Sequence, residues 1–506
     1  MPPAAPTRRR LIAGLAALPW IGRARAAADG ASAAAGGAAA GTAAPLSADQ
    51  ARRDLRILQR AFTALHPGLY RYASPAQIEA AFAAANAAVA AGCDAAQVFL
   101  HATRLAAAVR CGHTWTNPYN QGPTLRAALE ARADKLPLAL RAAEGRFLVT
   151  GSAAPGVAAG AELLAIDGRE MPAIVAALLP LLRADGANDD KRLAQVDDGS
   201  NGGELQRLLG LLFPPADGAY RLRLRDAAGG PERELRVAAL TAAARQRALA
   251  AVGVAPPSSA WRLELRDDIA LMSLPTFAFW NDAFDGVAEL RRSFATLQER
   301  RIPYLVIDLR ANEGGDDALA AALLGHLLTA PYTGPSWRRE SAYERVPYEL
   351  ARFLDTWDFS FFDRTGQVRP GPGRNRLLPD QAGETIAPRA PGYRGRVIAL
   401  VGPDNSSAGQ LLAEDLQRSG AALLVGRRTG GSLRGLNGGQ ICWLTLPESG
   451  ASVDIPLTAS FADGDPPDRG VIPEVEVAHR FADLAAGTDP DLVAARELIA
   501  GWRRAG

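Results

Sequence analysis

The feature that most constrains the fold is a buried strand that runs into a helix through two serines. Residues 396–402 read Arg-Val-Ile-Ala-Leu-Val-Gly, an apolar and β-branched run bounded by Gly395 and Pro403. From Ala408 onward leucines recur at helical spacing, so a helix begins at or near Ser406 and Ser407. Strands and helices alternate in this way over residues 261–481, which is typical of a layered α/β fold.

A serine at such a junction has two readings. Free backbone N–H groups and the helix dipole favour negative charge there. A hydrolase can therefore use that serine as its nucleophile, because the same N–H groups can hold an oxyanion. The alternative is that Asn405 or Ser406 caps the helix, which is a common role for these residue types. This stretch alone leaves both readings open.

Three motifs in the second half of the chain, in this order, together resemble peptidase family S41, which contains the tail-specific (C-terminal-processing) proteases and the tricorn core protease. They are Asp308-Leu309-Arg310-Ala311-Asn312-Glu313-Gly314-Gly315, then Ser407-Ala408-Gly409-Gln410 followed by Gly426-Arg427-Arg428-Thr429-Gly430-Gly431, and finally Gly470-Val471-Ile472-Pro473-Glu474. The resemblance implies a ClpP/crotonase-like layered protease core with Ser407 as the catalytic nucleophile. Glycine permits close backbone approach, and Ala408 opens a helix. We therefore expect the N–H groups of Gly314 or Gly315 and of Ala408 to form the oxyanion hole.

The catalytic base is expected to be a histidine. One branch of the family uses a lysine about two dozen residues after the serine, but the only lysines here are Lys135 and Lys191, far upstream. The tricorn-like branch instead takes a histidine from a Gly-His-Thr context, which this chain has at His113. A histidine is suited to removing a serine proton near neutral pH.

The remaining histidines, His66, His101, His326 and His479, have the contexts of helix ends, helices or strand ends and are expected to be structural. His113 needs a partner that fixes its tautomer. The resemblance places an acid just before the closing Gly-Val motif, where Asp468 lies one position away from the expected place. Thr114 or Thr116 is an alternative source of a hydroxyl.

The start of the chain resembles an export signal. Residues 1–26 contain five arginines, a short apolar stretch and an Ala-Arg-Ala site, in a twin-arginine-like order. Export would place the protein in the periplasm or outside the cell. An oxidising compartment would permit a Cys93–Cys111 bridge, and the odd cysteine count leaves at least one thiol free.

We expect six regions along the chain. They are a signal peptide at 1–26, a flexible linker at 27–46, an N-terminal helical domain at 47–130, a PDZ-like β-rich domain at 135–240, the protease core at 258–485 with an insertion at 332–394, and a C-terminal helix at 486–506. The PDZ-like assignment rests on residues 160–168 and implies peptide capture by strand addition, with a simple spacer as the alternative. The aromatic-rich insertion is expected either to cover the active site or to form a small core of its own.

The resulting hypothesis is an exported serine endopeptidase that acts on peptides or proteins. A net charge of +2 gives no sign of a nucleic-acid surface, no run is long enough for a membrane span, and no motif implies a cofactor or metal. The oligomeric state stays open. One alternative is a catalytically inert relative that binds peptides or apolar ligands, since Gln410 stands where the family usually has an acid. A second is a crotonase-like acyl-transfer enzyme, disfavoured because no basic cluster for coenzyme phosphates stands out.

Overall fold

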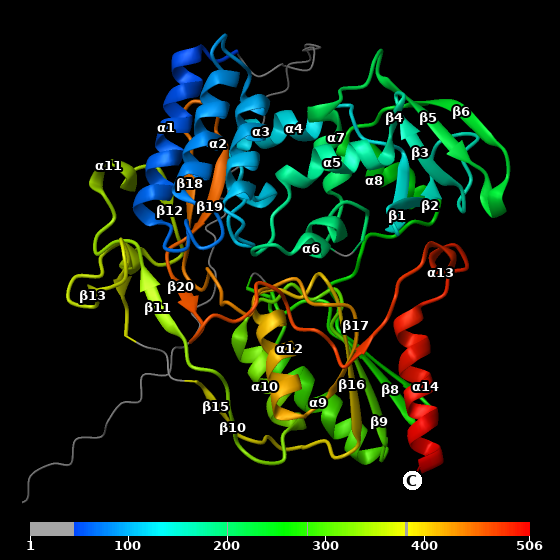
Figure 1. Ribbon diagram of the computed structural model, residues 1–506. Helices are drawn as coiled ribbons and strands as arrows, with labels where there is room; N and C mark the ends of the chain where they lie inside the picture. Colours follow the sequence, from blue (N-terminus) through cyan, green and yellow to red (C-terminus); the bar gives the residue numbers. More distant parts are fainter. Residues whose placement is uncertain (1–44, 200, 281, 380–382, 506) are drawn as a thin grey trace, which may run out of the picture.

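The computed structural model describes residues 45–199, 201–280, 282–379 and 383–505 (Figure 1). The expected signal peptide and nearly all of the expected linker lie outside these residues. Within them, no helix combines the length and apolarity that a membrane crossing requires. The three cysteines are free, so the permitted Cys93–Cys111 bridge does not form.

The first described part of the chain, residues 45–131, contains several helices. Its elements are α1 (Ala48–Leu65), α2 (Pro75–Ala88), α3 (Ala95–Ala108), η1 (Pro118–Asn120) and α4 (Pro123–Ala131). The first three helices each begin with a capping box, in which a serine or aspartate and a glutamine three residues later bond each other's backbone. This local chemistry fixes where each helix starts.

The helical domain shares its hydrophobic core with two strands from late in the chain. These are β18 (Ile441–Thr445) and β19 (Ser452–Pro456), which form a small sheet with β12 (Leu354–Asp355). Their buried side chains belong to the same cluster as Leu55, Phe62 and Phe99. Figure 1 shows the orange strands lying against the blue helices. The expected core at 258–485 is therefore not a single packing unit.

Residues 135–251, here called the second domain, form an antiparallel sheet in the order β1-β2-β3-β5-β6, with helices beside it. Its elements are β1 (Leu138–Ala143), β2 (Arg146–Ser152), β3 (Glu162–Ile166), β4 (Arg169–Glu170), α5 (Met171–Leu178), η2 (Leu179–Leu181), α6 (Asp189–Ala194), α7 (Glu204–Leu212), β5 (Ala219–Arg225), η3 (Ala227–Gly229), β6 (Glu232–Ala238) and α8 (Ala242–Ala251).

The edge strand β1 is already closed by its own chain. The Leu140 N–H donates to the Asp198 carboxylate at 2.9 Å, and the Asp198 N–H donates to the Leu140 carbonyl at 2.9 Å. The Ala142 N–H donates to Asp197 at 2.7 Å, and the Arg245 guanidinium donates to the Leu138 carbonyl at 2.6 Å. A peptide that added itself to this edge would have to displace these bonds.

The α/β core contains a six-stranded sheet in the order β21-β17-β16-β9-β8-β7, parallel except for the β7–β8 hairpin. Its strands are β7 (Arg262–Arg266), β8 (Ile269–Ser273), β9 (Tyr304–Asp308), β16 (Arg396–Val401), β17 (Leu423–Gly426) and β21 (Val475–Glu476). The helices α9 (Gly286–Glu299), α10 (Asp317–Leu327) and α12 (Ala408–Ser419) bury one face. The C-terminal helix α14 (Pro490–Ala505), preceded by α13 (Phe481–Ala485), covers the other.

The stretch 332–394 links the core to the helical domain. It consists of short elements: β10 (Tyr332–Thr333), β11 (Arg338–Ser341), α11 (Tyr348–Ala351), β12, η4 (Phe359–Phe362), β13 (Arg369–Pro370), β14 (Arg376–Leu377) and β15 (Thr385–Ile386), with β11 also pairing with β20 (Ala459–Phe461). Phe361 and Phe362 pack against the core of the helical domain, and Trp357 packs against Phe361 and Trp443. These aromatic side chains therefore extend the core that the helical domain shares with β18 and β19.

Candidate active site

Two neighbouring strands bring the serine and the glycine-rich turn to the same edge of the sheet. Strands β9 and β16 pair in parallel, with Asp308 opposite Leu400, and the Leu309 N–H then donates to the Leu400 carbonyl at 3.0 Å. Because parallel strands end on the same side, the segments that follow Asp308 and Val401 meet there. This is the convergence expected from the sequence.

Ser407 has the backbone of a strained elbow. Its φ is 50° and its ψ is −134°, a region that residues with a Cβ rarely adopt. Its side chain makes no capping hydrogen bond to α12 and is partly exposed. Asn405 and Ser406 bond the neighbouring turn instead, through the Asn312 carbonyl at 3.0 Å and the Glu313 carbonyl at 3.4 Å. The side chains of Asn405 and Ser406 therefore bond the glycine turn rather than cap α12.

The turn at Asn312–Gly315 lies directly against the elbow. A Cβ placed on Gly314 would lie 2.7 Å from the Ala408 nitrogen and 2.9 Å from the Ser407 Cβ, and φ is 107° at Gly314 and 138° at Gly315. Both constraints require glycine. The Gly314 N–H donates to Asn312 Oδ1 at 2.8 Å. Among the described residues, the N–H groups of Gly315 and Ala408 have no such acceptor, so these two are the available oxyanion donors.

His113 lies in the loop after α3, in a setting that keeps it neutral. Its ring packs against Gly438, where a Cβ would lie 3.4 Å from the ring atoms Cε1 and Nε2. Burial lowers the pKa of His113, opposed by the charge of Asp185. Its Nδ1 is buried without a hydrogen-bond partner among the residues that the structure covers, and no hydrogen bond joins it to Ser407 there. The lowered pKa favours the neutral imidazole that a general base requires.

His66 contacts Thr114, the residue that follows His113. Its Nε2 lies 2.8 Å from the Thr114 Oγ1, and burial lowers its pKa to about 3. Thr116 is likewise occupied, with its hydroxyl 2.7 Å from that of Thr103. Thr114 and Thr116 therefore have buried partners other than His113. His326 and His479 are bound to Pro391 and Asp491, in keeping with structural roles.

Asp185 lies beside the histidine loop, while the expected acid, Asp468, bonds a neighbouring segment. Asp468 accepts the Ala187 N–H at 3.1 Å and the Ser432 hydroxyl at 3.3 Å. Asp185 is buried, accepts the N–H of Gly112 at 2.9 Å, and its charge raises the pKa of His113. No local sequence pattern predicts that Asp185 lies beside His113, because the residue comes from the second domain and reaches this loop by tertiary packing.

Lys191 was excluded as a base by its distance along the chain, yet it lies next to the site in space. Its side chain is 1% exposed and forms an ion pair with Glu313. Its Nζ also donates to the Asp404 carbonyl at 3.1 Å. The Lys191 Nζ is thus committed to an ion pair and a hydrogen bond, which leaves His113 as the candidate base.

Gln410 has a structural task. Its side-chain oxygen accepts the hydroxyl hydrogen of Thr429, and that hydroxyl oxygen accepts the N–H of Val471 at 2.7 Å. Gln410 thus ties α12 to the two glycine-containing motifs that follow. A neutral amide can form this contact, so the replaced acid does not by itself indicate a lost activity.

Known proteins resemble the chain in its core and its fold. The model for peptidase family S41 matches residues 268–441. The structure of mature CPAF complexed with lactacystin aligns with a TM-score of 0.60 at 14% identity, covering 89% of this chain and 97% of that one. Mature CPAF in a second crystal structure aligns with a TM-score of 0.57, also at 14% identity, covering 87% and 94%.

No protein of curated function matches the chain in sequence. At 14% identity the structural likeness establishes the fold, while the family match covers the two strands, the glycine turn and the serine elbow. We conclude that residues 268–441 of this chain match peptidase family S41, in a fold similar to that of mature CPAF.

Proposed function

We propose that this protein is an exported serine endopeptidase in which Ser407 is the nucleophile and His113 the general base. The observation that carries the proposal is the strained, partly exposed Ser407 beside two N–H groups without acceptors, those of Gly315 and Ala408. Strain of this kind at a strand-to-helix turn is how hydrolases expose a nucleophilic hydroxyl.

The reaction would run in two stages. In the first stage, His113 takes the proton of the Ser407 hydroxyl while the serine oxygen bonds the carbonyl carbon of the peptide. The resulting oxyanion is held by the N–H groups of Gly315 and Ala408. The protonated His113 then gives that proton to the leaving amine, and the C–N bond breaks. A water molecule then gives a proton to His113 as its oxygen bonds the acyl carbon; the ester bond to Ser407 breaks, and His113 returns the proton to the serine oxygen. His113 must approach Ser407 to perform these transfers.

The direct test is covalent labelling of the mature protein with an organophosphonate probe. Wild type should label at one residue, Ser407, as located by peptide mass spectrometry. Ser407→Ala should not label, whereas the neighbouring Ser406→Ala should label normally. An unlabelled wild type would favour the inert peptide-binding or ligand-binding alternative. Lactacystin, with which mature CPAF was crystallised, serves as a second probe.

Two further parts of the proposal concern location and recognition. Export rests on the arginine-rich start of the chain, and recovery of protein with an intact Met1 from the native host would contradict it. Peptide capture by strand addition at β1 would require release of the bonds from Asp197, Asp198 and Arg245. We therefore assign substrate contact to the core rather than to this edge.

A further inference from the structure

Two cations from the second domain bind the carboxylate of the glycine turn. Arg183 Nη2 lies 3.2 Å from Glu313 Oε2, and Lys191 binds Oε1. Glu313 directly precedes Gly314 and Gly315. Its side chain is 27% exposed, against 16% for Arg183 and 1% for Lys191. The contact therefore joins residues about 120 positions apart and is largely shielded from solvent.

The two neighbouring cations keep the pKa of the Glu313 carboxyl group low. Burial alone would raise the pKa of Glu313, but Arg183 and Lys191 outweigh it and lower the pKa to about 2. The carboxylate is thus ionised whenever His113 is neutral. Removal of one member of a buried ion cluster leaves the others without compensation, which disturbs the local structure.

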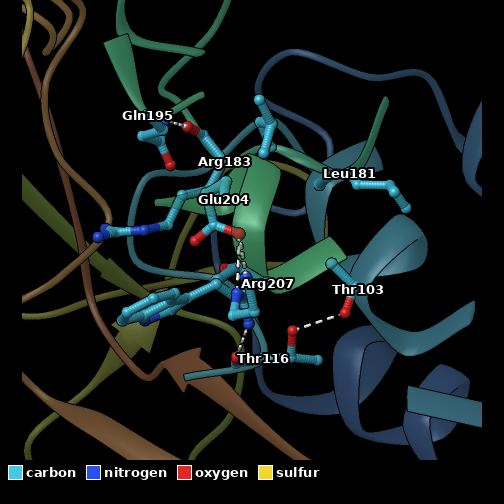
Figure 2. A pocket seen from close by; sticks show the side chains of 11 residues that line it. Thr103, Thr116, Leu181, Arg183, Gln195, Glu204 and Arg207 are labelled. Carbon is cyan, nitrogen blue, oxygen red and sulfur yellow. Dashed lines mark hydrogen bonds and ion pairs between the residues drawn. The ribbon is translucent and has the colours of Figure 1, made fainter. Parts of the chain in front are cut away.

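The same two cations also bind the other two parts of the site. Arg183 Nη1 donates to the Gly112 carbonyl at 2.7 Å, beside His113, and its guanidinium carbon lies 3.9 Å from the Trp115 ring centroid. Figure 2 shows Arg183 in the wall of the small polar cavity behind this loop. Lys191 donates to the carbonyl of Asp404, in the turn that leads to Ser407.

We infer that Arg183 and Lys191 are positioning residues that fix the glycine turn, the serine elbow and the histidine loop relative to one another. They touch no reacting atom. Their effect runs through Glu313, which directly precedes the two glycines of the turn, and through the carbonyl groups of Gly112 and Asp404. The inference rests on the proposed function, since it names what orients that catalytic site.

The test measures organophosphonate labelling kinetics of the full mature chain, separating the maximal rate, kinact, from the half-saturating concentration, KI. Lys191→Met keeps the length of the side chain and removes its charge. We expect it to lower kinact about 10- to 100-fold, with KI changed less than about threefold, because the oxyanion donors lose their alignment. Arg183→Met should act in the same direction.

The matched control is Arg428→Met. Arg428 binds Asp190 at 2.6 Å and also joins the core to α6, but this pair is exposed and does not reach Glu313. It should leave kinact unchanged. Equal losses in Arg428→Met and Lys191→Met would overturn the inference, because general domain contact would then explain both. Unchanged kinact in a folded Lys191→Met would overturn it as well.

The pH dependence of kinact provides a readout that a merely structural role would not produce. The groups facing His113 are Asp185 and Glu313, which raise its pKa, and Arg183 and Lys191, which lower it. The acid limb should therefore move to higher pH in Lys191→Met and to lower pH in Glu313→Gln. Limbs that stay fixed in both would contradict the inference.

Should Lys191→Met fail to fold, as judged by circular dichroism, Arg183→Met and Glu313→Gln carry the test. Failure of the proposed function has a different signature, because wild type itself would then not label at Ser407.

Discussion

The two halves of the candidate site are built by different means. One half consists of Ser407, Gly315 and Ala408. These residues lie in the segments that follow β16 and β9, two strands that are hydrogen-bonded to each other, so the backbone of the sheet sets their positions. His113 comes from a loop of the helical domain and is surrounded by charged side chains of the second domain. The first half is part of a folded unit, whereas the second depends on how three parts of the chain dock.

The difference teaches where such a site is sensitive. Backbone placement by adjacent parallel strands is disturbed only by changes that distort the turn itself. Placement by buried ion pairs is disturbed by any change of charge, since a buried charge without its partner is costly. The two halves should therefore respond differently to substitution and to pH.

The largest effect is expected from removing either reacting group. Ser407→Ala should abolish labelling, and His113→Ala should reduce hydrolysis of a peptide substrate nearly as far, because the two act as a unit. The double variant should be little worse than either single one. Substantial hydrolysis by His113→Ala would mean that the docked half does not supply the base.

A large effect confined to the backbone half is expected from Gly314→Ala. The new Cβ would lie 2.7 Å from the Ala408 nitrogen, at a φ of 107°. Displacement of an oxyanion donor typically reduces turnover about 10²–10³-fold, so kcat should fall by roughly this factor. Gly373→Ala, at another positive-φ glycine with no atom within 4 Å, is the control and should leave kcat near that of wild type.

Much of the backbone half could be predicted from the sequence, because strand, turn and helix signals are local. The strands at 304–308 and 396–401, the helix from Ala408 and the contact between their turns follow from such signals. The occupied N–H of Gly314 could not be foreseen, since it depends on the Asn312 side chain.

In the half of the site that depends on domain docking, only His113 was predicted from the sequence. Asp185, Arg183 and Lys191 have ordinary local contexts and reach the site by tertiary packing, so no periodicity or spacing marks them. The lysine argument illustrates the limit. Lys191 was excluded as the catalytic base because it lies far upstream of the position where the family has its lysine. The structure nevertheless brings Lys191 beside the site, where it pairs with Glu313.

An intermediate effect, visible mainly in pH dependence, is expected from Asp185→Asn. Asparagine can still accept the Gly112 N–H but has no charge, and that charge raises the pKa of His113. In wild type, burial lowers this pKa, so the acid limb of kcat/KM should lie below the ordinary value of about 6.5. In Asp185→Asn the limb should move further down. Asp468→Asn serves as the comparison, and a larger shift there would reassign the acid.

The smallest effect on activity is expected from Arg245→Ala, on the far side of the second domain. The substitution removes bonds to the Leu136 and Leu138 carbonyls and to Asp198. Thermal unfolding should show that the free energy of unfolding falls by about 1.5–3 kcal/mol, typical of hydrogen bonds to a charged group, while labelling of Ser407 stays normal. A marked loss of labelling would show that the edge strand communicates with the site.

Asp54 on α1 accepts the N–H groups of Glu448 and Ser449, and Ser449 lies 395 positions further along the chain. The earliest helices thus complete their core only when the strands around this turn have been synthesised. Long-range pairing of this kind forms late in folding. The loop with His113 follows these helices. A growing or truncated chain that ends before these strands would contain Ser407 but would not hold His113 in place. Proteolytic capacity would therefore arise only with the nearly complete polypeptide.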